Sequence, residues 1–84
     1  MEPYSPCPID TTAIELTAEL ENLAETLARH VHEVWAQSRI AGGQDEHPCL
    51  VHYDRLPESE KDIDRRVVRE TLKALIILGY TVSR

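Results

Sequence analysis

The sequence predicts a mainly α-helical domain of two principal helices joined by an extended crossing segment, in which short β-strands could form. Two long stretches, residues 17–41 and 57–78, repeat apolar residues at intervals of three and four, as a helix with one buried face does. The segment between them contains Pro48 and ends at Pro57, and its apolar residues suit an extended backbone. A chain of 84 residues forms one small domain, which is marginally stable alone.

Residues 1–12 form the first predicted segment, an extended N-terminal arm that precedes a folded domain over residues 13–84. Three prolines among the first eight residues prevent a regular helix in this arm. Tyr4 and Ile9 nevertheless give the arm apolar side chains. We therefore expect its second half to lie along the helices.

The first helix is predicted to begin after Thr17, whose side chain caps the helix, with acidic residues in the first turn. It should end at Gly42 and Gly43, because glycine adopts the left-handed conformation of a helix terminus without steric cost. Glu25 and Arg29 should form an ion pair on the outer face. The buried stripe should comprise Leu20, Leu23, Leu27, Val31, Val34 and Trp35, with Ala24 and Ala28 on the same side.

The crossing segment is predicted to contain a short strand or strand-like stretch. Leu50, Val51 and Tyr53 are residues that pack well on an extended backbone. Residues 80–83 could add a second short strand beside them. We interpret Pro48, in the unit His-Pro-Cys, as a structural residue of this crossing.

The second helix is predicted to start near Pro57, which suits the first helical position because its missing N–H would have no partner there. The helix could break or tighten around Asp64. It should run to Leu78 and end with Gly79 as its cap. The residues expected to face the first helix are Val68, Leu72, Leu75 and Ile76.

The last turns of the second helix are apolar around their whole circumference. Residues 74–78 read Ala-Leu-Ile-Ile-Leu, and one neighbouring helix covers only one side of such a segment. Either the N-terminal arm or a second copy of the chain must cover the other side. A second copy would form a homodimer with an isologous interface.

Composition excludes several classes of function. The formal net charge of −6 repels phosphate backbones, so we expect no general binding of nucleic acid. No run of 18 apolar residues is present, and the first residues lack the features of a signal peptide, which leads us to expect a cytoplasmic protein without a membrane segment. Cys7 and Cys49 are then expected to be free thiols. No cofactor motif occurs in the sequence.

Four basic residues, Lys61, Arg65, Arg69 and Lys73, recur every fourth position on the second helix. They could line one face and hold a phosphate group, because arginine forms bidentate contacts with phosphate. The alternative is a solvated face, since acidic residues stand at pairing distance from these cations. The wider set of candidate ligand residues is Arg39, His47, Tyr53, Lys61, Arg65 and Arg69.

A metal site is a second candidate. His47, Cys49 and His52, with Cys7 supplied by the arm, offer the nitrogen and sulfur ligands that zinc prefers. The spacing matches no common zinc module. Alternatively, Cys49 is a small buried residue that packs like an apolar side chain.

Three further residues have structural interpretations. Trp35 on the inner stripe is expected to be part of the core. Asp64 could be a local cap, or an anchor that pairs with Arg39. His32 stands near no nucleophile, and no catalytic triad or paired-acid signature occurs, so we expect no enzyme activity.

The order of motifs resembles the RyR domain. The relevant motifs are Val-His-Glu-Val-Trp-Ala from residue 31, His-Pro-Cys-Leu-Val from residue 47, Leu-Pro-Glu-Ser-Glu-Lys from residue 56, and Glu-Thr-Leu-Lys-Ala-Leu from residue 70. This family occurs as tandem pairs in ryanodine receptor channels and as single copies in bacterial and phage proteins. The resemblance implies that a single copy forms a homodimer which imitates the tandem pair. It also implies that His32 forms a hydrogen bond with the crossing segment.

The sequence departs from the family in one loop. RyR domains usually carry Gly-Trp-Thr-Tyr-Gly before the His-Pro-Cys unit, whereas four residues, Gly-Gln-Asp-Glu, stand here between Gly42 and His47. The loss removes aromatic stacking surface and adds acidic charge. We therefore expect a non-enzymatic interaction and assembly module, homodimeric in form. The alternative is a sensor of a small phosphate-bearing ligand, such as an adenine nucleotide or an ADP-ribose-like molecule.

Overall fold

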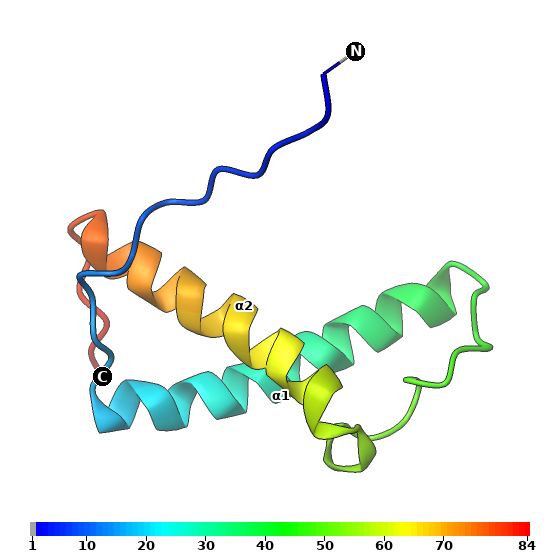
Figure 1. Ribbon diagram of the computed structural model, residues 1–84. Coiled ribbons are helices and arrows are strands. Elements are labelled where there is room, and N and C mark those ends of the chain that lie inside the picture. The colour runs from blue at the N-terminus through cyan, green and yellow to red at the C-terminus, as the bar shows by residue number, and fades with distance from the viewer. Residues whose placement is uncertain (1) are drawn as a thin grey trace.

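Two long helices and one short turn of helix make up the regular structure of residues 2–84. The computed structural model describes residues 2–84, and its elements are α1 (Ala18–Ala41), the 3₁₀ turn η1 (Tyr53–Arg55) and α2 (Glu58–Ile77). Figure 1 shows α2 crossing α1 near the middle of α1, with the end of α2 and the start of α1 on the same side of the crossing. The predicted mainly helical fold with two principal helices is confirmed.

No β-strand forms within residues 2–84, so the short strands considered at residues 50–53 and 80–83 are absent from this part of the chain. The backbone of the crossing segment bonds locally instead. The N–H of Leu50 donates to His47 O (3.0 Å), which places Pro48 inside a turn, and the N–H of Leu56 donates to Tyr53 O (3.0 Å). Groups used in such turns are not free for a strand ladder.

Helix α1 begins and ends where its sequence predicts. The side chain of Thr17 accepts a hydrogen bond from the N–H of Leu20 (3.2 Å), which satisfies one of the unpaired donors of the first turn. Gly42 caps the other end, and Gly43 follows with φ of 78°. That positive φ explains the glycine, because a side chain there would be strained.

The buried face of α1 is rotated from the predicted stripe. Ala24, Ala28 and His32 are its buried residues, whereas Val34 is exposed and Trp35 is only half-buried. The two alanines have small side chains, which lets α2 pack close to the α1 backbone at the crossing. Larger side chains border this contact instead of filling it, namely Leu20, Leu27 and Val31.

Helix α2 is continuous through Asp64, so the break considered there does not form. Pro57 occupies the N-cap position, one residue before its predicted place at the first helical position. The helix ends at Ile77 with Leu78 as its cap, and Gly79 follows with φ of 96°. Gly79 therefore has the predicted role of terminating the helix, one residue beyond the cap.

The core lies where the two helices cross and the crossing segment returns under them. Tyr53, 1% exposed, is the largest fully buried side chain, so the short turn η1 anchors the crossing segment in the core. The other buried apolar residues are Leu16, Ala24, Ala28, Leu56, Val68 and Leu72.

The N-terminal arm is only partly docked. Residues 2–10 have no regular structure, and Figure 1 shows the start of the chain projecting away from the helices. Thr11 is buried, and its hydroxyl donates a hydrogen bond to Glu70 on α2. Residues 8–12 border a groove beside α2, so only the last part of the arm lies along a helix, whereas Tyr4 is exposed.

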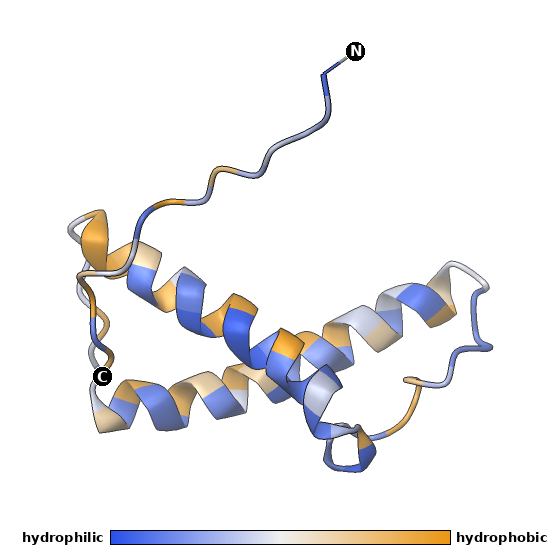
Figure 2. Cartoon of the chain, in the orientation of Figure 1, coloured by the Kyte–Doolittle hydropathy of each residue, from blue (hydrophilic) through white to orange (hydrophobic). Residues whose placement is uncertain are grey.

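Neither helix within residues 2–84 has both the length and the apolarity needed to span a lipid bilayer. Figure 2 shows why: along both helices hydrophilic residues alternate with hydrophobic ones, and only the last turn of α2 is hydrophobic on successive residues. The helices are therefore amphipathic elements, each with one face available for packing.

Candidate functional site

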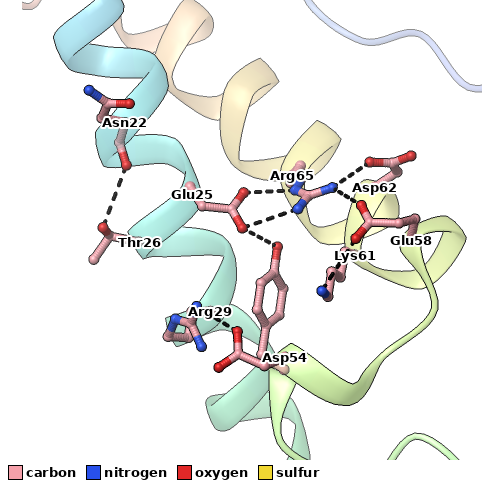
Figure 3. Close-up of polar contacts among 10 residues, drawn as sticks. Asn22, Glu25, Thr26, Arg29, Asp54, Glu58, Lys61, Asp62 and Arg65 are labelled. Atoms are coloured by element: carbon pink, nitrogen blue, oxygen red, sulfur yellow. Dashed lines mark hydrogen bonds and ion pairs between the residues drawn. The ribbon is translucent and has the colours of Figure 1, made fainter.

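A network of polar contacts joins α1, α2 and the crossing segment around Arg65. The guanidinium of Arg65 donates to both carboxylate oxygens of Glu25 on α1 (2.7 and 3.2 Å), and also to Glu58 (2.8 Å) and Asp62 (2.9 Å) (Figure 3). The Tyr53 hydroxyl donates to the same Glu25 carboxylate at 3.0 Å. One guanidinium thus links both helices, while Tyr53 ties the crossing segment to the same carboxylate.

The protonation states in this network fit a structural role. Hydrogen bonds from Arg65 hold the pKa of Glu25 below its ordinary value, although partial burial opposes that shift. Burial, followed by the bond to Glu25, raises the pKa of the Tyr53 hydroxyl. At neutral pH Glu25 is therefore ionised and Tyr53 protonated, each fixed in its ordinary form and neither near a pKa suited to proton transfer.

The predicted basic stripe is present, and each of its cations has an acidic partner. Besides Arg65, the ion pairs join Lys61 to Glu58 (3.3 Å), Arg69 to Glu21 (3.0 Å) and Lys73 to Glu70 (3.9 Å). This arrangement favours the alternative of a charge-paired face, because a phosphate ligand would have to compete with these carboxylates.

Arg29 does not pair with Glu25, contrary to the sequence prediction. It pairs with Asp54 of η1 at 2.9 Å, and its guanidinium lies 5.0 Å from the centre of the Tyr53 ring. The pair expected within one helix is replaced by contacts to the crossing segment, because η1 packs against α1 and brings Asp54 within reach.

A second site is a cavity of about 310 Å³ between the second half of α1, the turn at residues 47–49 and the start of α2. Trp35 is central to it: the His32 ring stacks on the indole at 5.7 Å between centroids, and the His47 ring meets it edge-on at 5.1 Å. The Arg39 guanidinium lies 5.5 Å from the centre of the Trp35 ring. The lining residues are His32, Trp35, His47, Cys49, Leu56, Glu60, Ile63 and Asp64.

The six residues proposed as ligand contacts thus fall into separate groups. Arg39 and His47 meet at Trp35, whereas Tyr53, Lys61 and Arg65 belong to the network around Glu25. The sixth, Arg69, lies further along α2 and pairs with Glu21. The fold does not gather the set into one pocket.

His32 connects α1 to the crossing segment, as the family resemblance implies. Its ring nitrogen Nε2 lies 2.6 Å from the carbonyl oxygen of Val51, and because a carbonyl only accepts, Nε2 carries the proton. The side chain is buried. His32 therefore holds the wall of the cavity in place.

Asp64 does not pair with Arg39, so the predicted anchor is wrong. It forms no ion pair within residues 2–84, and Arg39 stacks on Trp35 instead, with its buried Nε unpaired. Burial raises the pKa of Asp64, His32 opposes this shift, and the charge of Glu60 adds to it. The ionised Asp64 is thus a local source of instability.

Replacing Asp64 with asparagine is expected to raise the melting temperature at pH 7. A carboxyl whose pKa is raised by folding costs stability once it ionises, so the gain should appear as pH rises above 3.8, the ordinary value for Asp, and disappear below it. Thermal unfolding of both proteins from pH 3 to pH 7 measures the difference. Asp45→Asn, at an exposed position, is the matched control, and an equal gain at pH 3 would contradict the electrostatic cause.

The residues of the proposed metal site are not assembled. Within residues 2–84 no group of three or more His, Cys, Asp or Glu side chains could hold a metal ion. Cys7 is exposed on the arm and His52 is exposed in the crossing segment. The N–H of Cys49 donates to His47 Nδ1 at 3.0 Å, a contact that shapes the turn around Pro48.

Two apolar surfaces of α2 are exposed. The C-terminal patch consists of Leu75, Ile77, Leu78 and Tyr80. The sequence predicted exposed apolar surface at residues 74–78, but Leu75 was expected to face the first helix and is exposed instead. The outer stripe was not expected and consists of Ile63, Val67, Thr71 and Ala74. The stripe forms one wall of an open groove of about 860 Å³, whose other wall is residues 8–12. The outer stripe could have been recognised in the sequence, because its residues follow one another at intervals of four, four and three.

Comparison with protein families finds a match that covers most of the chain. The model of a family described as RyR domain matches residues 4–84, which is nearly the whole chain. The match includes the arm residues beside the groove, both helices and the crossing segment.

Proposed function

Because the chain belongs to the RyR domain family, we propose that it is a non-enzymatic interaction module that assembles as a homodimer through α2. The observation that carries the proposal is the exposed C-terminal patch. Leu78 is 60% exposed, and Leu75, Ile77 and Tyr80 are exposed beside it. A group of exposed large apolar side chains on a small domain is typical of a site of protein association.

The proposed dimer also suits the size of the domain. A chain of 84 residues buries a small core, and a partner that covers apolar surface adds stability by mass action. The two cysteines are free thiols, which fits our proposal that the module acts in the reducing environment of the cytoplasm.

Replacing Leu78 with glutamate is expected to abolish the dimer, because the charge would have to be buried in the apolar contact. Sedimentation equilibrium over a dilution series measures the association constant. Ile40→Glu is the matched control, since Ile40 is 57% exposed and lies at the end of α1 far from the patch (Figure 1). A wild-type protein that is monomeric at every concentration would overturn the proposal.

A second candidate function is sensing of a small phosphate-bearing ligand such as an adenine nucleotide or ADP-ribose. The cavity beside Trp35 favours it, because His32 and His47 line the cavity and Arg39, which lies beside the Trp35 ring, could bind phosphate. The carboxylates of Glu60 and Asp64 oppose it by repelling phosphate. Thermal shift with millimolar ATP, ADP-ribose or cyclic ADP-ribose tests it, and a flat response would exclude these ligands.

A further inference from the structure

The outer stripe of α2 faces away from α1. Val68 and Leu72 are the buried residues of α2, whereas Ile63 is 58% exposed and Val67 55% exposed. At 100° per residue, the four stripe residues fall within one narrow sector of the helix, opposite Leu72. From Ile63 to Ala74 the stripe is about 16 Å long at the rise of an α-helix. It is therefore a second apolar face, of which only the first residue, Ile63, borders α1, at the cavity beside Trp35.

The groove beside the stripe has an open apolar floor. Ile63, Val67 and Ala74 contribute side chains from α2, and Pro8 and Ile9 contribute side chains from the arm. The arm is held in place at this point by the hydrogen bond between Thr11 and Glu70. The groove thus has two defined walls, one of which is a helix.

One edge of the stripe carries opposite charges one helical turn apart. Arg66 and Glu70 both line the groove. Arg66 forms no ion pair within residues 2–84, while Glu70 contacts Thr11 and Lys73. When a helix packs antiparallel against its own copy across a twofold axis, this edge meets the same edge of the copy. Arg66 of each copy then faces Glu70 of the other.

We propose that the outer stripe is covered by the outer stripe of a second copy, with the two α2 helices antiparallel across a twofold axis that passes between Val67 and Thr71. This inference rests on the proposed self-association and specifies its geometry. Ile63 then packs against the partner's Ala74, a large side chain against a small one. Arg66 forms an ion pair with the partner's Glu70, and the symmetry repeats the pair.

The charge pattern is the reason for a second copy as the occupant. A helix from another protein would need an acidic and a basic residue placed to match Arg66 and Glu70. A second copy of α2 already carries both residues at the matching positions. The same arrangement places Ile9 of each arm at the border of the partner's helix, where its exposed side chain gains apolar contact.

Charge reversal tests the geometry in the full chain. Arg66→Glu and Glu70→Arg should each raise the dissociation constant of the dimer about tenfold or more, because each replaces two ion pairs with two like-charge contacts. The double variant should recover affinity to within about threefold of wild type. Arg55→Glu, at an exposed position with no ion pair among residues 2–84, makes the same charge change away from the stripe and should have no effect.

A cross-link provides the second measurement. Val67→Cys combined with Thr71→Cys in a Cys7→Ser background should form a disulfide-linked dimer on mild oxidation, because residue 67 of one copy lies opposite residue 71 of the other. Ile40→Cys in the same background should not. A dimer that is insensitive to all charge reversals and does not cross-link between residues 67 and 71, yet is lost in Leu78→Glu, would overturn this geometry and leave the proposed function standing. A monomer throughout would overturn both.

Discussion

Replacing Tyr53 with alanine is expected to lower the free energy of unfolding by about 3–5 kcal/mol, the usual cost of removing a buried aromatic ring. The ring is the largest fully buried side chain, and it fills the space between the crossing helices. The crossing segment has no strand ladder to hold it, so the side chains of Tyr53 and Leu56 and the bond from His32 to Val51 attach it to the core. Stabilities of whole domains lie at about 5–15 kcal/mol, so Tyr53→Ala should be close to unfolding.

Tyr53→Phe separates the ring from the hydroxyl. It keeps the packing and removes only the bond to Glu25, which should cost about 1 kcal/mol. Urea unfolding followed by circular dichroism measures both variants at one protein concentration. Equal losses in the two variants would mean that the hydroxyl, and not the ring, secures the crossing segment.

Replacing Arg65 with methionine is expected to lower the melting temperature at pH 7 more than Tyr53→Phe does and less than Tyr53→Ala does. Methionine keeps most of the side-chain length but cannot donate to Glu25, Glu58 or Asp62. These carboxylates would then lie close together without the cation that they share. Arg69→Met is the matched comparison, because among residues 2–84 Arg69 pairs with a single carboxylate, that of Glu21, across the same helix pair.

The pH dependence of the difference in melting temperature shows whether ion pairing causes the loss of stability in Arg65→Met. Arg65 lowers the pKa of Glu25 and of Glu58, so its stabilising contribution is present above their ordinary value of 4.5 and is lost as pH falls through the lower folded-state pKa values. The gap in melting temperature between wild type and Arg65→Met should therefore be widest above pH 4.5 and narrow in acid. A gap that stays constant down to pH 2 would attribute the loss to packing alone.

Some features of the fold follow from neighbouring residues and were predicted correctly. Thr17 caps α1, Gly43 and Gly79 adopt positive φ where each helix ends, and α2 starts near Pro57, one residue later than predicted. Each depends on the backbone preference of one residue and on its neighbours within one turn. Such local preferences are the same in any tertiary context.

Other features depend on which surfaces meet. Hydrophobic spacing predicted a stripe on α1 but not its rotation, which the close approach of α2 at Ala24 and Ala28 decides. Glu25 was assigned to Arg29 because the two stand one turn apart, whereas its partner in the fold is Arg65, forty positions away. Charge pairs on a helix surface are weak, so a better partner on another element displaces them.

The candidate sites divide in the same way. The apolar end of α2 was visible in the sequence, because a run of five apolar residues leaves some of them uncovered in any packing. The outer stripe was missed, since Ile63 and Val67 stand among charged residues and no pattern shows which face the partner helix takes. The cavity at Trp35 also needed the fold, because His47 reaches it from the crossing segment.

The sequence by itself determined the family, the helix ends and the presence of apolar surface in excess of what one neighbour covers. Only the tertiary structure decided how the helices rotate, which carboxylates Arg65 joins and which face of α2 stays open. The physical reason is range: caps and turns are set by interactions within a few residues, whereas rotation and pairing are set by the packing of side chains that the chain brings together from distant positions.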